Sequence, residues 1–509
     1  MPAINPIIPG FAPDPSIVGV GNWYFLVTSS FHLFPGLPIY ASKDLVSWQH
    51  IGNAIHRPNQ LSLKGSEARL RPSLVAGGGL YAPTIRHHND TFYIVSTNSV
   101  RGRPTSDTPN DSKQNFIVST RDIWTNDWSD PVYFDFDGID PDLFFENGKT
   151  YVAGSAPGSG INLFEIDIGT ARKLSPERTI WTGSGGEHPE GPHIYKQKGY
   201  YWLMVAEGGT HEGHMVTMAR ARDIWGPYES CPHNPILTAR GTSEYIQHTG
   251  HCDAIQDEQG QWWGVCLGVR KDKKGRYALG RETILTRGDW TGDWLSFQPV
   301  TVSPAGLVRA EQQPGFSPAP NVDLVYIRDP DLRNYEISDA GATAALTASQ
   351  VDLDHPELSP TFVGKRQRVL AGQSEVILCR ESESWTRAKA PVKAGLACYK
   401  DEHRYLRVFY EASRSVISFE LCNNARQITK TVEREIGGWN DIKLSIRYTG
   451  MQYQILYGHP GSLGNELTLL AVVDVMDLME ADFVGPVIGI FAVTEADSYP
   501  IRFSNLSIE

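Results

Sequence analysis

The chain has 509 residues and a formal net charge of −12, from 46 lysine and arginine against 58 aspartate and glutamate residues. This length predicts two or three domains with large cores, and the acidic balance without a basic block excludes an ordinary nucleic-acid partner. No apolar stretch approaches the roughly 18 residues of a membrane-spanning helix, so we expect no membrane partner. The six cysteines form no CxxC pair, which gives no indication of zinc and favours free buried thiols over disulfides.

From residue 12 onward, one pattern recurs five times. Each copy has a polar residue at the start of an apolar strand, a turn of Gly, Asn or Asp, an aromatic strand, and then outer strands with a Trp. The copies begin at Ala12, Tyr81, Ile139, Pro189 and Gly250. Five antiparallel four-stranded units joined by turns are typical of a five-bladed β-propeller. A β-sandwich or a right-handed β-helix fits less well, because the interval is long and uneven and the hairpins are rich in aromatic residues.

The repeat stops near residue 303, where a stretch rich in proline and glycine begins. We expect residues 1–302 to form the propeller and residues 303–331 to form a linker. From residue 332 short strands return at a spacing of roughly ten residues, which favours an antiparallel β-sandwich of the jelly-roll type over 332–509. The predicted fold is therefore all-β. The sandwich could bind carbohydrate or simply cap the propeller, and capping is the favoured interpretation.

The innermost strand of each propeller blade lines the central axis, so equivalent positions of the repeats meet at one opening. Three carboxylates and a histidine take those positions, with Ala82-Pro83 in the remaining repeat: Asp14, Asp140, Glu190 and His251. Crowded carboxylates repel one another, and this cost favours a functional over a structural explanation. Glu190 alone would be interpreted as a surface residue in a turn.

Two carboxyl groups that flank a glycosidic bond, one protonated and one ionised, are the minimal requirement for hydrolysing a glycoside. In the inverting geometry they stand about 6.5–9.5 Å apart, which leaves room for a water molecule. We assign Asp14, held between two prolines, as the general base and Glu190 as the general acid. Asp140 would raise the pKa of Glu190 and orient it, with Asp142, deeper in the same strand, as the second choice.

The chain resembles glycoside hydrolase family 43, in its two-domain β-xylosidase and α-L-arabinofuranosidase branch. The resemblance is carried by NPIIPGFAPDPSI, SSFHLFPGLPIYASKDLVSW, GIDPDLF, PEGPHIYKQKGYYWLMVAEGGT, TGHCDAI and LGRETIL. It implies a five-bladed propeller with a concanavalin-like sandwich, and an inverting hydrolase of xylan-derived pentosides. It also implies Asp14 as base, Asp140 as modulator of the pKa, and Glu190 as acid.

The same resemblance implies further site residues. Phe31 matches an aromatic of the pocket wall, Arg281 an arginine that holds sugar hydroxyls, and Phe483 an aromatic of the C-terminal domain that reaches over the pocket. Without the resemblance, Arg281 would be interpreted as a surface ion-pair partner. His251 matches a histidine below the pocket floor that often helps to hold a calcium ion or a water molecule. We expect no required cofactor, with a structural calcium near the axis as an open alternative to a purely structural histidine.

At two subsite walls the chain departs from the xylosidase pattern. His32-Leu33 replaces a Glu-Trp pair, and Tyr81 replaces the Trp of a Trp-Ala-Pro sequence, which makes His32 and Tyr81 candidate substrate-binding residues. We therefore expect an exo-acting, inverting hydrolase that releases terminal α-L-arabinofuranosyl residues from arabinoxylan or its oligosaccharides. A β-D-xylosidase acting on xylo-oligosaccharides, or a dual activity, is the nearest alternative. A non-catalytic sugar-binding propeller is a remote one.

The N-terminal sequence MPAINPIIPGF contains neither the charged nor the apolar region of a signal peptide. Three N-x-S/T sequons give weak support to secretion: Asn89, Asn110 and Asn505. We expect a secreted protein present as its mature chain, with an intracellular location as the alternative.

Overall fold

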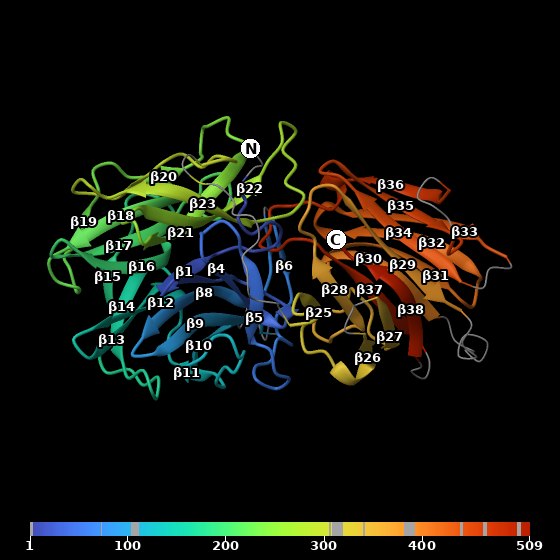
Figure 1. Ribbon diagram of the computed structural model, residues 1–509, viewed down its shortest axis with the longest axis horizontal. Helices are drawn as coiled ribbons and strands as arrows, with labels where there is room; N and C mark the ends of the chain where they lie inside the picture. The colour runs from blue at the N-terminus through green and yellow to red at the C-terminus, as the bar shows by residue number, and fades with distance from the viewer. Residues whose placement is uncertain are drawn as a thin grey trace.

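The computed structural model of the protein consists of two bodies, the propeller coloured blue to yellow-green and the sandwich coloured yellow to red (Figure 1). It describes residues 4–72, 74–102, 111–304, 307, 319–338, 342–380, 392–437, 441–461, 466–495 and 500–509. In these ranges the regular structure is strands and three short 3-10 turns, and no helix is long and apolar enough to cross a membrane. The predicted all-β class is confirmed.

Five antiparallel sheets form the blades of the propeller, and the strands of each sheet follow one another along the chain. The first blade contains β1 (Ser16–Val20), β2 (Trp23–Val27), β4 (Gly36–Ser42) and β5 (Gln49–Ile55). The second contains β8 (Gly79–His88), β9 (Thr91–Val100), β10 (Ser112–Thr120) and β11 (Val132–Phe134). The third contains β12 (Ile139–Glu146), β13 (Lys149–Ala156), β14 (Gly160–Ile166) and β15 (Arg178–Trp181).

The fourth blade has one strand more than the others, because β20 pairs with β18 beside β19. Its strands are β16 (Glu190–Gln197), β17 (Tyr200–Glu207), β18 (Met215–Ala221), β19 (Glu229–Ser230) and β20 (Leu237–Thr238). The fifth blade contains β21 (Ile246–Gln256), β22 (Trp262–Arg270), β23 (Glu282–Asp289) and β24 (Ser296–Phe297). The N-terminal segment closes the ring on this blade, since Ile8 bridges to Thr283 and the Asn5 side-chain amide donates to the Leu285 carbonyl at 2.8 Å.

Five separate apolar clusters hold the blades together, one between each pair of neighbouring blades. The cluster between the fourth and fifth blades, for example, contains Trp202, Met204, Val216, Ile246 and Cys266. Alternate side chains of a strand point to opposite faces, so a strand packed between two blades needs apolar residues on both faces. This requirement accounts for the nearly continuous apolar runs that the repeats contain.

The inner strands carry one irregularity at the same place near the axis. In the second to fifth blades the pairing register shifts between Tyr81 and Thr84, Ile139 and Asp142, Glu190 and His193, and Gly250 and Asp253. One residue within each shift has a positive φ: Ala82, Asp140, Gly191 and His251. Asp14 has the same conformation just before β1. A β-bulge of this kind redirects a side chain, here toward the axis of the propeller.

This register corrects the predicted alignment of the repeats. Gly191, and not Glu190, takes the position equivalent to Asp140, so Glu190 precedes the bulge by one residue. Gly191 is required there for two reasons. Its φ is +55°, and a Cβ atom at this position would lie 2.9 Å from a carbon of the His251 ring.

The C-terminal sandwich consists of an eight-stranded and a seven-stranded antiparallel sheet around one large apolar core. The first sheet contains β3 (Leu33–Phe34), β25 (Leu324–Ile327), β28 (Phe362–Arg366), β37 (Val487–Thr494), β30 (Val392–Asp401), β31 (Arg404–Glu411), β32 (Val416–Asn423) and β33 (Ile428–Glu435). The second contains β26 (Tyr335–Ile337), β27 (Thr343–Thr347), β38 (Pro500–Ser507), β29 (Gly372–Cys379), β34 (Ile442–Tyr448), β35 (Gln452–Gly458) and β36 (Thr468–Asp474). The 3-10 turns are η1 (Leu332–Asn334), η2 (Asn424–Arg426) and η3 (Val475–Asp477). All six cysteines are free.

The two bodies share a sheet. Strand β3 comes from the first blade and pairs with β25, which lies inside the stretch 303–331 predicted as a linker. The first strand of the sandwich therefore precedes residue 332, while residues 305, 306 and 308–318 of that stretch lie outside the described residues. A second contact joins the short hairpin of β6 (Arg69–Arg71) and β7 (Leu74–Ala76) to the sandwich, through the bridge between Val75 and Asp482. Because of these contacts, the sandwich lies directly against the opening of the propeller.

Candidate active site

A cavity of about 240 Å³ lies where the inner strands meet, and every blade and the sandwich contribute to its lining. Eight of the nine site residues predicted from the sequence line it: Asp14, Phe31, Tyr81, Asp140, Glu190, His251, Arg281 and Phe483. The ninth, His32, is not among the residues around this cavity. The propeller thus brings together three carboxyl groups that are far apart in the sequence.

Asp14 is held as an ionised carboxylate. The Ser29 hydroxyl donates to its Oδ2 at 2.6 Å, and Nη1 of Arg281 donates to its Oδ1 at 2.9 Å. Burial raises the pKa of Asp14, but the charge of Arg281 and the hydrogen bond from Ser29 help to keep that pKa below its ordinary value of 3.8. A carboxylate that stays ionised at neutral pH can act as a general base and accept a proton from an attacking water molecule.

The other two carboxyl groups are shifted in the opposite direction. Burial, followed by the charge of Asp14, raises the pKa of Glu190 from 4.5 to about 7. Burial, followed by the charges of Glu190 and Asp14, raises the pKa of Asp140 well above 3.8. The backbone N–H of Gly191 donates to Oδ2 of Asp140 at 3.0 Å, so Asp140 is bonded to the residue that follows Glu190. One cavity therefore combines a carboxyl group whose pKa is lowered with two whose pKa values are raised.

Asp140 and Glu190 act on each other in this cavity. The charge of Glu190 contributes to the raised pKa of Asp140, after burial, and burial and the charge of Asp14 raise the pKa of Glu190. The role of Asp140 as a modulator of the Glu190 pKa stays a prediction. The contact of Asp140 with Gly191 makes it a positioning residue for Glu190.

Arg281 connects the propeller to the sandwich inside the cavity. Its Nη1 donates to Asp14 and, at 2.9 Å, to the hydroxyl of Thr210, and its Nη2 donates to the backbone carbonyl of Phe483 at 2.9 Å. The guanidinium carbon also lies 5.6 Å from the ring centroid of Phe31 and 5.4 Å from that of Phe483. Burial of an arginine requires such partners, and here they fix the cation against the base.

Aromatic rings form one wall of the cavity. The centroid of the Phe31 ring lies 5.1 Å from that of Tyr81 and 5.8 Å from that of Phe483. The Tyr81 hydroxyl donates to the Gly77 carbonyl and accepts a hydrogen bond from Arg101 at 3.1 Å. The Tyr81 hydroxyl is thus bonded within the protein, and the apolar rings of this wall can pack against the carbon skeleton of a sugar in the cavity.

Comparison with known proteins identifies the group to which this site belongs. The family model described as glycosyl hydrolases family 43 matches residues 3–295. The chain belongs to glycoside hydrolase family 43. A second model, the β-xylosidase C-terminal concanavalin A-like domain, matches residues 316–509. The predicted family, the propeller and the concanavalin-like sandwich are thereby confirmed, and so is the class of enzyme, a glycosidase.

Several family 43 proteins resemble the chain over most of its length. The non-reducing end α-L-arabinofuranosidase BoGH43B of Bacteroides ovatus is 32% identical over 507 residues, which cover 96% of this chain and 90% of that protein. A xylosidase/arabinosidase of Butyrivibrio fibrisolvens is 39% identical over 314 residues, covering 58% of this chain and 56% of the relative. Among solved structures, the xylan β-1,4-xylosidase of Bacillus halodurans C-125 has a TM-score of 0.85 at 25% identity, covering 99% of this chain and 100% of that one.

In this family 43 enzyme, His251 packs on the backbone of Gly191 and faces Asp14, with 4.0 Å between Nδ1 and Oδ1. Burial lowers the pKa of His251 to about 4, so its ring is neutral. Among the described residues, no group of three or more His, Cys, Asp and Glu side chains could hold a metal ion. A calcium ion takes six to eight oxygen ligands, part of which water molecules can supply, so the calcium expected near His251 stays a prediction.

His32 points into the interface with the sandwich. Its ring is buried and lies 5.8 Å from the ring of Tyr399, and burial lowers its pKa to about 3. The preceding residue, Phe31, has a φ of 52°, and this turn sends the two neighbouring side chains to different sides. The prediction that His32 contacts substrate is corrected for this reason: His32 packs the domain interface while Phe31 lines the cavity.

Asp142 lies below the cavity in a buried network of charges. Its Oδ1 is 2.8 Å from Nη2 of Arg86, and Nη1 of Arg86 is 2.9 Å from Oδ2 of Asp253. The Tyr195 hydroxyl donates to the other oxygen of Asp253 at 2.6 Å. Asp142 therefore has a structural partner, which leaves Asp140 as the acid at the cavity.

Sequence reasoning missed four residues on the rim and wall: Leu74, His188, Thr210 and His211. Thr210 ends the segment EGGT, and His188 and His211 flank the segments PEGPH and EGGT, which carry the family resemblance. These three residues lie in loops, where strand periodicity gives no direction to a side chain. Burial lowers the pKa of His211 to about 4, so this ring also faces the cavity uncharged. A search of the Gly-rich segments beside β16 and β17 could have found these three, whereas Leu74 lies in the separate hairpin of β6 and β7.

Proposed function

We propose that the protein is an exo-acting, inverting hydrolase that removes terminal α-L-arabinofuranosyl residues from arabinoxylan or its oligosaccharides. One observation carries the proposal: two carboxyl groups of the same small cavity have pKa values shifted in opposite directions, Asp14 downward and Glu190 to about 7. Pairs of acids with such opposed shifts divide the roles of base and acid between them.

The proposed mechanism uses both protonation states. Asp14, as a carboxylate, accepts a proton from a water molecule whose oxygen attacks the anomeric carbon of the bound sugar. Glu190, as a carboxylic acid, donates its proton to the glycosidic oxygen as that bond breaks. The attack comes from the face opposite the leaving group, so the configuration at the anomeric carbon inverts. Exchange of one proton with solvent returns Asp14 and Glu190 to their starting states.

The dimensions of the cavity favour removal of one terminal sugar. Its volume of about 240 Å³ lies below the range of roughly 300–1,000 Å³ that holds drug-sized ligands. Phe31, Leu74 and Phe483 close one side of it. A polysaccharide chain cannot pass through such a space, whereas a single pentose at a chain end or branch can enter it.

The choice of arabinofuranose is supported by the relative that matches the chain over almost its full length, which is named a non-reducing end α-L-arabinofuranosidase. A β-D-xylosidase activity is the second candidate. It is supported by a relative named xylosidase/arabinosidase and by the structural likeness to a xylan β-1,4-xylosidase. A pocket that fits one pentose end can serve both substrates.

Two experiments test the proposal. In the first, products are analysed after incubation with arabinoxylan and with xylobiose; arabinose with intact xylobiose supports the arabinofuranosidase, and xylose from xylobiose supports the second candidate. In the second, Glu190→Ala is assayed on natural oligosaccharides and on aryl pentosides with acidic leaving groups. We expect a loss of about 10²–10⁴-fold on the oligosaccharides and a smaller loss on the aryl substrates, which need no proton. Equal activity of variant and wild type on oligosaccharides would exclude Glu190 as the acid.

A further inference from the structure

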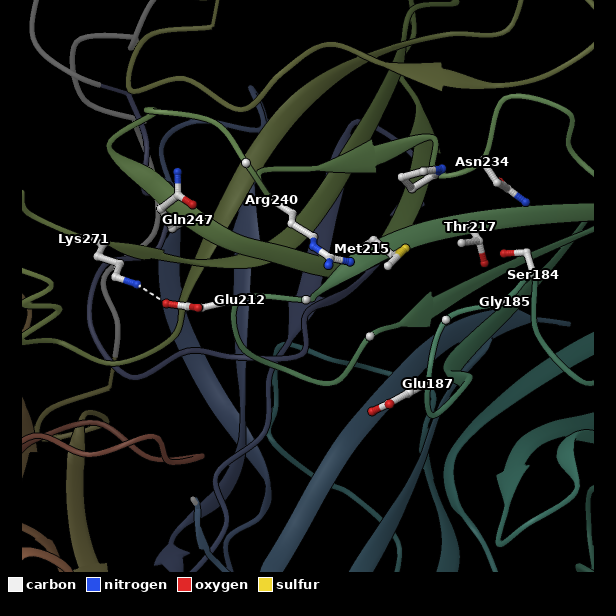
Figure 2. A pocket seen from close by; sticks show the side chains of 15 residues that line it. Ser184, Gly185, Glu187, Glu212, Met215, Thr217, Asn234, Arg240, Gln247 and Lys271 are labelled. Atoms are coloured by element: carbon white, nitrogen blue, oxygen red, sulfur yellow. Dashed lines mark hydrogen bonds and ion pairs between the residues drawn. The ribbon is translucent and has the colours of Figure 1, made fainter. Parts of the chain in front are cut away.

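A second and larger cavity lies beside the catalytic one. Its volume is about 820 Å³, and its lining comes from the loops of the fourth blade and from the start of the fifth. Figure 2 shows the charged side chains that face it: Arg240 and the paired Glu212 and Lys271 on one part of the wall, and Glu187 on the loop opposite. The proposed hydrolysis uses none of these side chains.

Two loops form a wall common to both cavities. In the first loop, Glu187 lines the second cavity and the next residue, His188, lines the catalytic one. In the second loop, His211 lines the catalytic cavity and Glu212 the second one. The backbone N–H of Gly208 donates to the carbonyl of Glu187 at 2.7 Å, which ties the two loops together.

The catalytic cavity opens toward this wall. Of the described residues that line it, His188 is the exposed one, whereas Phe483 of the sandwich is half-buried and its neighbours Phe31 and Arg281 are buried. The part of a substrate that remains outside the catalytic cavity therefore leaves it next to His188. That direction leads over the loop of Glu187 to the second cavity.

The charges of the second cavity indicate what it can bind. Two acids, Glu187 and Glu212, and two bases, Arg240 and Lys271, face it, so their charges cancel. Nζ of Lys271 is 2.9 Å from Oε1 of Glu212, but the side chains of Glu187 and Arg240 make no hydrogen bond or ion pair within the described part of the chain. Both side chains are exposed to solvent, and a neutral ligand whose hydroxyls donate and accept can replace the water around an acceptor and a donor of this strength.

Other ligand classes fit this cavity less well. An anionic ligand would meet the carboxylates of Glu187 and Glu212, and an apolar ligand would leave the charged groups without water or partners. The lining also contains hydroxyl and amide side chains, those of Ser184, Thr217 and Gln247. The hydroxyls of Ser184 and Thr217 already donate to Oε1 of Glu207, at 3.0 and 2.6 Å, and can still accept from a polyhydroxylated, uncharged molecule.

We propose that the second cavity binds the neutral oligosaccharide chain from which the terminal pentose is released, with Glu187 and Arg240 as its specificity-determining residues. This inference rests on the proposed function, since it names the part of the same substrate that stays outside the catalytic cavity. Small aryl pentosides have no such part and do not reach the second cavity.

The test compares Glu187→Gln and Arg240→Ala with a matched control, Arg178→Ala, which removes an exposed arginine from an outer strand away from both cavities. KM and kcat are measured on an aryl arabinofuranoside and on an arabinoxylo-oligosaccharide. For the oligosaccharide we expect KM to rise about tenfold in each cavity variant, because each loses a hydrogen bond to a charged group. For the aryl substrate, and for Arg178→Ala on both substrates, we expect wild-type values. Equal KM for the oligosaccharide in all four proteins would overturn the inference.

A binding measurement separates this inference from the proposed function. Xylotetraose is titrated into Glu190→Ala and into the double variant Glu190→Ala/Arg240→Ala, neither of which needs to turn over. Binding weakened about tenfold by Arg240→Ala supports the cavity as an oligosaccharide site, and unchanged binding overturns it. If the wild type fails to hydrolyse aryl pentosides, the proposed function is wrong, and the titration still decides whether the cavity binds a xylan chain.

Discussion

Glu190 allows a prediction about stability that is independent of activity. Its pKa is raised from 4.5 to about 7, first by burial and then by the charge of Asp14. A rise of this size corresponds to about 3 kcal/mol between its two protonation states. Because Glu190 is partly exposed to the cavity, water screens part of this energy, and we expect about 1–3 kcal/mol.

The direction in which pH changes the stability of the folded protein follows from proton linkage. Below pH 4.5 the Glu190 carboxyl is protonated in both the folded and the unfolded chain, and its shifted pKa has no effect on stability. As pH rises from 4.5 to about 7, the unfolded chain releases the proton more readily than the folded protein, so the folded protein loses stability. Above pH 7 this loss is complete. Glu190→Gln has no proton to lose and avoids it.

We therefore expect Glu190→Gln to be more stable than the wild type at pH 8, by about 1–3 kcal/mol, and to show no such advantage at pH 4. Denaturant unfolding followed by tryptophan fluorescence, at several pH values between 4 and 8, measures the difference. Glu187 is an exposed residue of the adjacent loop, so Glu187→Gln controls for the effect of replacing any carboxylate by an amide. A stability difference between Glu190→Gln and wild type that is the same at pH 4 and pH 8 would refute the reasoning.

Three further predictions concern neighbouring residues. Arg281→Leu removes a cation that lowers the pKa of Asp14, so the acid limb of the plot of kcat/KM against pH should move to higher pH. An unmoved limb would show that Arg281 does not set the pKa of the base. Gly191→Ala should destabilise the fold by at least about 1–2 kcal/mol in denaturant unfolding, because its φ is +55° and the new Cβ meets His251; wild-type stability would contradict this account. His32→Asn should lower the stability of the fold, because His32 is buried against Tyr399, but leave KM for an aryl pentoside unchanged. A raised KM would indicate that His32 contacts the substrate.

Much of the fold is predictable because its signals are local and repeated. An apolar strand, a turn and an aromatic strand recur five times. Each repeat supplies one blade, and each blade needs these apolar strands to pack against its two neighbours. The three acids could be found in the same way, since each stands at the axis end of an inner strand. The register of Glu190 relative to Asp140 could not be predicted, because a β-bulge adds one residue to a strand without a change in composition.

The remaining errors have a common cause, the contact between the two bodies. Strand β25 lies in a proline-rich stretch and is short, and it pairs with β3 from the first blade, where Tyr326 faces Phe34 and Ile327 faces Leu33. His32 follows the cavity residue Phe31, yet the local turn directs it to Tyr399 in the sandwich. No pattern within either segment contains information about a partner so distant in the chain.

The configuration of the first-formed sugar tests the central claim most directly. The account assigns Asp14 to activating a water molecule, so proton NMR during hydrolysis of an α-L-arabinofuranoside should show the β-anomer of arabinose first, with the α-anomer appearing later by mutarotation. The α-anomer as the first product would mean retention through a covalent intermediate, and it would contradict the role given to Asp14.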